Sequence, residues 1–448
     1  MKLRKIKWSN HPVLGNLELD FTNQTENACD TIVIAGENGL GKTTILEIIY
    51  QFLREGTITP FEYLEYEADG NRYKAFPLDG AVLDSFFNIE NCNGGNVTAI
   101  RYDRNNNAQN IAANTFDPRH YGCAYTKAKA MYETKKVTSI GTSTLDNETF
   151  KDKEENPVTL KQLFIDVQSQ DNTAFRKYAQ EYSGETGLDE TFSNQYAKMK
   201  RFSSAFNSFF DHLKYKGISQ TGGAYEILFE KHGHEIELDH LSTGEKQIVF
   251  RGAYLLKNQK SVNGGIVLID EPEISMHPLW QKKTLDYYQN LFIVEGDQQT
   301  QLIVATHSEG VVSSAVKEPD KAKVIVLKED SSTITLGDDN YPLIFDGNAN
   351  EINYQAFGIN NTEYHDALYG YIEMEHWFND FKNRHALVPY NKLENNGTIT
   401  PQNVSLSTKI RHIIHHPENT HNSFTEADLQ ESIQRMRDFI LDKRAGRI

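Results

Sequence analysis

One short stretch, Ile34 to Thr44, limits what this chain can fold into more than any other. It reads Ile-Ala-Gly-Glu-Asn-Gly-Leu-Gly-Lys-Thr-Thr and fits the pattern G-x-x-x-x-G-K-[ST] without a mismatch. The β-branched apolar run Thr31 to Ala35 precedes it, and the apolar-faced pattern Ile45 to Tyr50 follows. The sequence therefore predicts a buried parallel strand, a glycine-rich turn and a helix in that order, which is an α/β arrangement.

The glycines of this turn indicate phosphate chemistry. Without Cβ atoms, the backbone can turn its N–H groups inward around phosphate oxygens, and the helix N-terminus adds its dipole. Lys42 is predicted to reach the β- and γ-phosphates of ATP, and Thr43 to ligate Mg²⁺. A turn without chemical meaning is the alternative, but the strand and helix on either side disfavour it. The predicted nucleotide contacts in the loop are Gly36, Glu37, Asn38, Gly39, Gly41, Lys42, Thr43 and Thr44.

Composition narrows the class of protein. The chain has 448 residues, 24% of them charged and 38% hydrophobic, which is typical of a globular protein with two or three domains. A net charge of −16 disfavours a broad nonspecific grip on nucleic acid. Cys29, Cys92 and Cys123 form no CxxC pair, so neither a disulfide framework nor a thiolate zinc site is indicated. No apolar run has signal-peptide or transmembrane length, so we expect a cytoplasmic protein without a membrane partner.

Two later strand patterns end in residues suited to ATP hydrolysis. The apolar run from Gly265 ends in Asp270 and Glu271, and the run Leu302 to Ala305 ends just before His307. Asp270 suits a hold on Mg²⁺ or its waters, and Glu271 suits the base that orients the attacking water. His307 is predicted to contact the γ-phosphate. Alone, each of these would be more simply a capped strand end or a satisfied core histidine; the phosphate loop favours the catalytic interpretation.

The order of these motifs carries a family resemblance. A phosphate loop, a long insertion, the stretch Leu241 to Gln247, the Asp-Glu-Pro-Glu strand and a strand ending in Thr-His-Ser resemble the ABC-type ATPase heads of the SMC and RecF-like class. More narrowly, Asp270 to Pro278 resembles the stand-alone ABC-type ATPases of bacterial anti-phage and toxin-like systems. The resemblance covers about residues 1–345, apart from the insertion. It leaves the Q-loop glutamine unassigned, with Gln109 as the candidate.

In such heads, the signature motif closes on the nucleotide of the opposite protomer. The resemblance therefore implies that Ser242, Gly244 and Glu245 contact ATP across a head-to-tail dimer or higher oligomer. The residues themselves also predict an N-capped helix in which Ser242 and Glu245 form a capping box. Both interpretations can hold together, because the cap presents the amides.

The predicted domain plan is an ABC-type head with an insertion and an appendage. Residues 1–55 and 223–346 form the two parts of the head. Residues 56–222 are expected to be an inserted lid, mostly helical, and residues 347–448 an all-α domain, whose last helix is expected to start with a capping box from Ser423 to Glu426.

The appendage contains a second motif. Arg411 and His416 fit the R-x4-H pattern and resemble the pair in HEPN ribonucleases; an ABC head followed by such a domain looks like the PrrC-type anticodon nucleases. The resemblance implies that His416 acts as acid or base and that Arg411 stabilises the phosphorane. Two other interpretations stay open. The histidines could favour the helix C-terminal dipole, or His412 and His416 could bind zinc, although no third ligand is apparent.

Three functions follow from these resemblances. In the first, the ATPase is a sensor and switch of a bacterial anti-phage or toxin-like system and gates a C-terminal ribonuclease acting on RNA. In the second, it is a PtuA-like scaffold that holds and activates a separately encoded nuclease. The third is a RecF-like role in repair of DNA, which the acidic net charge disfavours.

Overall fold

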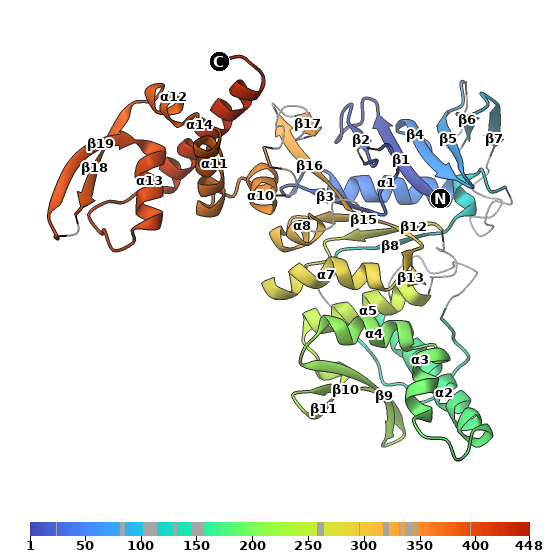
Figure 1. The fold of residues 1–448 in the computed structure, drawn as a ribbon. Coiled ribbons are helices and arrows are strands. Elements are labelled where there is room, and N and C mark those ends of the chain that lie inside the picture. The colour runs from blue at the N-terminus through green and yellow to red at the C-terminus, as the bar shows by residue number, and fades with distance from the viewer. Residues whose placement is uncertain are drawn as a thin grey trace. The chain divides into compact units, whose positions relative to one another are not determined.

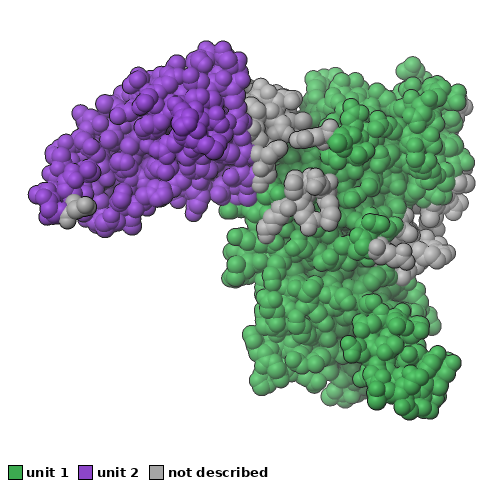
Figure 2. Space-filling view, viewed as in Figure 1, with its two compact units in different colours: residues 1–335 green, residues 336–448 purple. Residues whose placement is uncertain are grey.

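The structure of the chain is a computed structural model. It describes residues 1–23, 25–80, 86–101, 114–129, 132–145, 156–257, 264–294, 296–316, 322–330, 333–336, 344–345, 348–394 and 396–448. The chain divides into two compact units, Met1–Thr335 and Leu336–Ile448 (Figure 2). The sequence predicts this boundary later, at residue 347.

The centre of the first unit is a six-stranded sheet with the order β17-β16-β3-β15-β12-β8. Its strands are β3 (Thr31–Ala35), β8 (Cys123–Thr126), β12 (Ile266–Asp270), β15 (Gln301–Thr306), β16 (Ala322–Asp330) and β17 (Thr333–Leu336). The pairs from β16 to β8 are parallel, with Asp270 opposite Ala305 and Thr306 opposite Ala35. The carboxyl ends of β3, β12 and β15 therefore meet at one edge of the sheet.

A second, antiparallel sheet lies on the other side of helix α1 (Lys42–Glu55), as Figure 1 shows. Its order is β2-β1-β4-β5-β6-β7, and its strands are β1 (Lys2–Trp8), β2 (Glu18–Asp20), β4 (Phe61–Ala68), β5 (Asn71–Pro77), β6 (Phe86–Asn91) and β7 (Val97–Arg101). Phe52 of α1 packs against Phe61 and Phe87 of this sheet. The opposite side of α1 contacts β8, β12 and β15, so the helix is buried between two sheets.

The expectation of a mostly helical insertion at 56–222 is wrong for its first part. Residues 61–101 form strands β4 to β7, and β8 joins the central sheet. The burial of Phe61 to Ala68 alternates between the two faces of the strand, which is the period of a half-buried strand. The helical part begins only at Pro157. It comprises α2 (Pro157–Glu181), α3 (Leu188–Gln195) and α4 (Lys200–Phe209), and the short η2 (Pro118–His120) precedes it.

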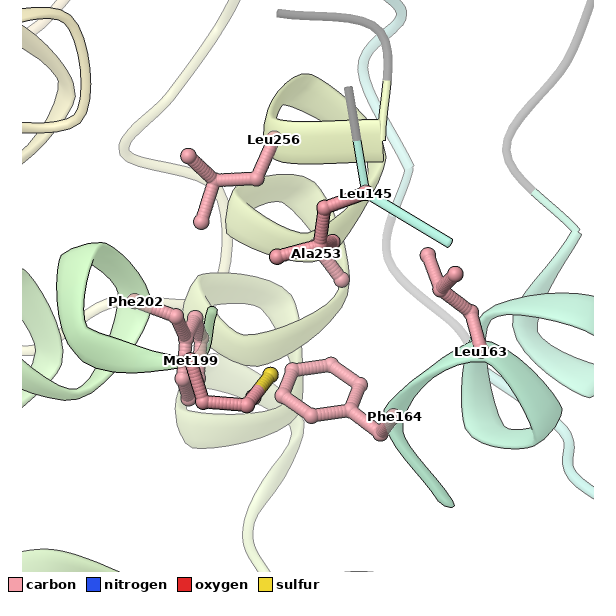
Figure 3. A pocket seen from close by; sticks show the side chains of 7 residues that line it. All are labelled: Leu145, Leu163, Phe164, Met199, Phe202, Ala253 and Leu256. Carbon is pink, nitrogen blue, oxygen red and sulfur yellow. The ribbon is translucent and has the colours of Figure 1, made fainter. Parts of the chain in front are cut away.

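The helical part packs directly on the helix that follows the signature, α5 (Thr243–Lys257). Apolar side chains from α2, α4 and α5 face one another around a small cavity, together with Leu145 (Figure 3). The cavity encloses about 10 Å³ and its lining is apolar, so it is too small and too apolar to hold a bound water. Its lining residues are Leu145, Leu163, Phe164, Met199, Phe202, Ala253 and Leu256. The insertion and the signature helix therefore share one core.

A small antiparallel sheet leads into the signature. Its order is β11-β10-β9, with β9 (Leu213–Thr221), β10 (Ala224–Lys231) and β11 (His234–Glu237), and it lies beside α4 (Figure 1). Strands β10 and β11 form a hairpin with Gly233 at its turn, where His232 and Gly233 both have positive φ, at 51° and 81°. The remaining elements of the unit are η3 (Leu238–His240), α7 (Pro278–Asn290), β13 (Ile293–Val294), β14 (Asp297–Gln298) and α8 (Glu309–Ala315).

The second unit is mainly helical but contains a β-hairpin, so the all-α expectation is wrong. Its helices are α10 (Ala349–Phe357), α11 (Thr362–Met374), α12 (Phe378–Asn383), α13 (Leu406–His415) and α14 (Glu426–Arg444), and its strands are β18 (Leu387–Leu393) and β19 (Ile399–Ser405). The segment around Gly397 is the turn of this hairpin. Side chains from α11, α13 and α14 form the core, including Leu429, Ile433, Met436 and Ile440 of the last helix.

The last helix does start with a capping box, but two residues later than predicted. Thr425, not Ser423, is the N-cap, and its partner at the third helical position is Asp428. Ser423 and Thr425 can each offer a hydroxyl oxygen to the free amides of a first helical turn. The S-x-x-E pattern alone could therefore not decide which of them is the N-cap. Among the helices of the described ranges, none is long and apolar enough to cross a membrane.

Candidate functional site

The predicted motifs meet at the carboxyl edge of the central sheet. Thr43, the first threonine after the phosphate-loop lysine, donates a hydrogen bond from Oγ1 to Asp270 Oδ2 at 2.9 Å. Asp270 ends β12, and β15 lies between it and β3, from which the loop starts. Residues 227 positions apart in the chain are therefore in contact. Parallel strands bring their ends to one edge, which is why two residues predicted to act on one Mg²⁺ lie side by side.

The phosphate loop is held in shape by its own backbone. A Cβ at Gly36 would lie 2.8 Å from the carbonyl oxygen of Leu327, so only glycine fits beside β16. Lys42 is buried and donates hydrogen bonds from Nζ to the carbonyls of Gly36 (2.8 Å) and Glu37 (2.7 Å). Burial lowers the pKa of Lys42, while the carboxylates of Glu271, Glu273 and Asp270 oppose the shift. The tip of the loop, Glu37, Asn38 and Gly39, is exposed, as is Thr43, and Thr44 is partly buried.

Three carboxylates crowd the end of β12. Burial raises the pKa of Asp270 to about 6; the hydrogen bond from Thr43 and the charge of Arg251 act against it, and the neighbouring Glu271 and Glu273 add to it. Glu271 has a φ of 43°, a left-handed conformation that is unfavourable for a glutamate. Such backbone strain persists only where the surrounding structure holds it.

Sequence reasoning missed Glu273, which is buried beside His307. Its Oε1 accepts hydrogen bonds from Thr306 Oγ1 (2.7 Å) and the backbone N–H of His307 (3.0 Å). His307 Nδ1 lies 3.4 Å from the same oxygen and 3.3 Å from Glu271 Oε1. Glu273 thus fixes the end of β15 and places the histidine against Glu271. Its position three residues after Asp270 was the available signal, but only the fold shows which strand it reaches.

The signature forms the predicted capping box. Glu245 Oε2 accepts from the backbone N–H and the Oγ of Ser242, each at 2.8 Å, and the Glu245 N–H donates to Ser242 Oγ at 3.4 Å. Burial tends to raise the pKa of Glu245, but bonds from Lys231 and Ser242 leave it lowered. A Cβ at Gly244 would lie 2.6 Å from Ser275 O, so the start of α5 packs closely on the loop that follows Glu273.

Two more residues that sequence reasoning missed connect α5 to the carboxylate loop. Gln247 is fully buried and donates from Nε2 to the carbonyl of Pro272 at 2.9 Å. Arg251, one turn later and also fully buried, donates to the carbonyls of Glu271 (3.3 Å) and Lys127 (2.8 Å). The available signal was the i, i+4 spacing of two polar residues within an apolar helix. The signature helix and the Asp-Glu-Pro-Glu loop therefore form one packed assembly.

The edge fits a magnesium nucleotide. Among the described residues, neither Asp270 Oδ1 nor Glu273 Oε2 has a hydrogen-bond partner, although both are buried. Buried carboxylate oxygens without partners are costly, and a hard cation with its waters would satisfy them. The glycine backbone and Lys42 supply donors for phosphate oxygens beside this cation position. Gln109, the candidate Q-loop glutamine, lies outside the described residues.

Arg411 and His416 make separate contacts within the chain. The Arg411 guanidinium lies over the Tyr369 ring, 4.4 Å from its centroid, and 3.4 Å from Glu373, both on α11. His416 is the C-cap of α13 and pairs instead with Glu418 in the following loop at 3.0 Å. Arg411 lies within α13, whereas His416 lies just beyond its last residue in a non-helical conformation. Within the ranges that the structure covers, no cluster of three or more His, Cys, Asp or Glu is placed to hold a metal, so His412 and His416 gain no third zinc ligand there.

Part of the chain matches a known protein family. Residues 104–313 match a family described as "AAA domain, putative AbiEii toxin, Type IV TA system". This range contains the signature, the carboxylate strand and His307.

The chain is also similar to one curated relative and to two solved structures. The chain is 32% identical over 100 residues to the retron Vc95 probable ATPase of Vibrio cholerae serotype O1 biovar El Tor; the match spans 20% of this chain and 18% of that protein. The SMC head domain from Thermotoga maritima covers 75% of this chain and 98% of its own at 14% identity, with a TM-score of 0.37. The recombination mediator protein RecF covers 75% of this chain and 97% of its own at 13% identity, with a TM-score of 0.33.

Proposed function

We propose that this chain is a magnesium-dependent ATPase whose site is the carboxyl edge formed by β3, β12 and β15. The observation that carries the proposal is the contact between Thr43 and Asp270, at 2.9 Å, beside a glycine loop and a buried lysine. Thr43 and Asp270 would hold Mg²⁺, and the loop amides with Lys42 would hold the phosphates. When bound, the cation supplies charge stabilisation at the transferring phosphoryl group.

The protein's own groups would then activate and orient water. Glu271 accepts the proton of the attacking water or orients it, since its carboxylate is the most accessible of the three at 24% side-chain exposure. His307, 3.3 Å from Glu271, faces the same region and is partly exposed, so it can contact the terminal phosphate while Glu273 holds it in place. Gln247 and Arg251 keep the Glu271 backbone in position from α5.

The second element of the proposal is a dimer joined by ATP. Ser242 and Gly244 present an amide-rich helix start that the chain's own phosphate loop does not need, and a second copy's nucleotide is the natural ligand for it. Two heads would then bind two ATP molecules between them and separate after hydrolysis. Closure would act on the carboxylate loop directly, because Gly244 packs on Ser275.

We further propose that this switch operates in a bacterial anti-phage or toxin-like system. The family match, whose description names a putative AbiEii toxin, and the retron-associated relative support this role. For the second unit, the separate contacts of Arg411 and His416 favour a docking module for a separately encoded nuclease over a built-in HEPN-like ribonuclease.

The dimer tests the proposal. Glu271→Gln should slow hydrolysis and trap an ATP-bound dimer, measurable by light scattering of the full-length chain after size exclusion with Mg²⁺ and ATP. Glu309→Gln is the matched control, because Glu309 is exposed at the start of α8 and outside the site; it should stay monomeric after ATP is consumed. A Glu271→Gln protein that stays monomeric with ATP, or that hydrolyses at the normal rate, would contradict the proposal.

A further inference from the structure

Beside the signature, a row of aromatic rings runs from the core to the surface. We call Trp280, His212 and His232 the ring stack. The rings of Trp280 and His212 are 6.1 Å apart at 24°, and those of His212 and His232 are 4.9 Å apart at 11°. At the inner end, Phe210 packs edge-on against Trp280 at 5.0 Å. At the outer end, His232 is exposed, so the row is closed on one side and open on the other.

The ring stack contacts the signature at two points. A Cβ at Gly244 would lie 3.6 Å from a ring carbon of Trp280. His212 Nε2 lies 3.9 Å from Glu245 Oε1, the oxygen that also accepts a 2.8 Å hydrogen bond from Lys231. The other oxygen of Glu245 caps Ser242. The position of the rings is therefore fixed relative to the helix start that is proposed to bind phosphate.

Turn geometry alone does not account for the outer ring. His232 and Gly233 occupy the two left-handed positions of a two-residue hairpin turn, at φ 51° and 81°. Asparagine is the usual residue at the first of these positions, and it satisfies the turn without any ring. The imidazole nevertheless lies nearly parallel to His212, which extends the row by one exposed face.

We propose that the ring stack is a subsite for the base of the nucleotide held in the phosphate loop of a second copy of this chain. The inference rests on the proposed ATP-joined dimer. There, Ser242 and Gly244 would take the terminal phosphate of the partner's nucleotide, and the ring stack beside them offers a flat surface for the other end of the same molecule. Aromatic faces bind bases by stacking, and the larger purine rings stack better than pyrimidines. The subsite thus gives the dimer its preference for ATP.

The test uses a substitution that keeps the turn. His232→Asn removes the ring but tolerates the left-handed backbone. Its control is His234→Asn, which changes an exposed histidine on the same hairpin that lies outside the ring stack. In a Glu271→Gln background, the nucleotide concentration needed for half-maximal dimerisation is measured with ATP and with CTP. We expect His232→Asn to raise it about tenfold for ATP and little for CTP, as for loss of one stacked base, and His234→Asn to leave both unchanged.

A mixed dimer tests whether the ring stack acts across the interface. One copy carries Lys42→Ala and the other Glu271→Gln, so only the second copy holds nucleotide. His232→Asn should weaken ATP-dependent pairing when it is placed in the Lys42→Ala copy and have no effect in the other.

The outcomes distinguish failure of the ring stack as a base subsite from failure of the proposed ATP-joined dimer. An unchanged preference for ATP over CTP, or an equal effect from either copy, would overturn the ring stack as a base subsite while the dimer stands. The absence of any ATP-dependent dimer in the Glu271→Gln protein would overturn both.

Discussion

The edge of the central sheet and the face of α13 teach opposite lessons about motifs. At the sheet edge, Thr43 and Asp270 are far apart in sequence and 2.9 Å apart in space. At the end of α13, Arg411 and His416 are five residues apart and contact different groups, Glu373 and Glu418. Parallel strands oblige their ends to meet, whereas no such constraint makes a helix residue and the residue after that helix face one another within the chain. A motif is therefore informative when the fold forces its residues to converge.

The largest expected effect lies at the sheet edge. Lys42→Ala should weaken ATP binding by about 100-fold or more, because the only buried cation of the phosphate loop is lost from contact with charged phosphates. Isothermal titration with Mg²⁺ and ATP measures it. Lys282→Ala, on the exposed face of α7, is the control and should bind normally. Unchanged affinity in Lys42→Ala would mean that convergence at this edge does not create a nucleotide site.

The second-largest expected effect is a change in folding stability caused by the buried carboxylate of Asp270 at the end of β12. Burial raises the pKa of Asp270 from 3.8 to about 6. Between pH 3.8 and about pH 6, the Asp270 carboxyl is therefore mostly protonated in the folded protein and mostly ionised in the unfolded chain. Stability without nucleotide therefore falls as the pH rises through this window. Asp270→Asn removes the charge and should raise the free energy of unfolding by roughly 2 kcal/mol at pH 7.5, with a difference that disappears near pH 4.

Thermal melts across this pH range measure the difference, and ATP hydrolysis should be lost in the same variant because a magnesium ligand is gone. A variant that is less stable than the wild type at pH 7.5 would show that Asp270 is not under electrostatic strain.

The smallest effect lies on α13. Arg411→Ala removes a guanidinium–ring contact with Tyr369 and should destabilise the second unit by about 1 kcal/mol, whereas His416→Ala, in an exposed pair, should change its stability little. Chemical denaturation of the two variants measures this difference. Discrete RNA fragments in cells that express the wild type, lost with both variants while ATPase activity persists, would restore the paired-nuclease interpretation and break the comparison.

The sequence predicts the residues at the strand ends, which the fold forces to converge, better than the residues that contact them. The apolar runs before Gly36, Asp270 and His307 identified three buried strands, and their chemistry followed from their ends. The roles of Glu273, Gln247 and Arg251 could not be predicted, because each depends on which backbone group lies opposite in the fold.

Strands β4 to β6 were missed for a different reason. Their alternation is embedded in a segment rich in Asn, Asp and Tyr that has the composition of an irregular insertion. The hairpin of the second unit was missed because it lies between helical patterns in a segment predicted to be all-α, although its strands pair from Leu387 to Ser405.

The most direct test of ATP hydrolysis at the sheet edge is the rate of phosphate release from ATP by the purified full-length chain, with and without Mg²⁺, beside Glu271→Gln and Glu309→Gln. We expect Mg²⁺-dependent release by the wild type and Glu309→Gln, and a rate at least about 100-fold lower in Glu271→Gln, as for loss of a general base. Equal rates in Glu271→Gln and the wild type, or no release by the wild type, would contradict the claim that this sheet edge hydrolyses ATP.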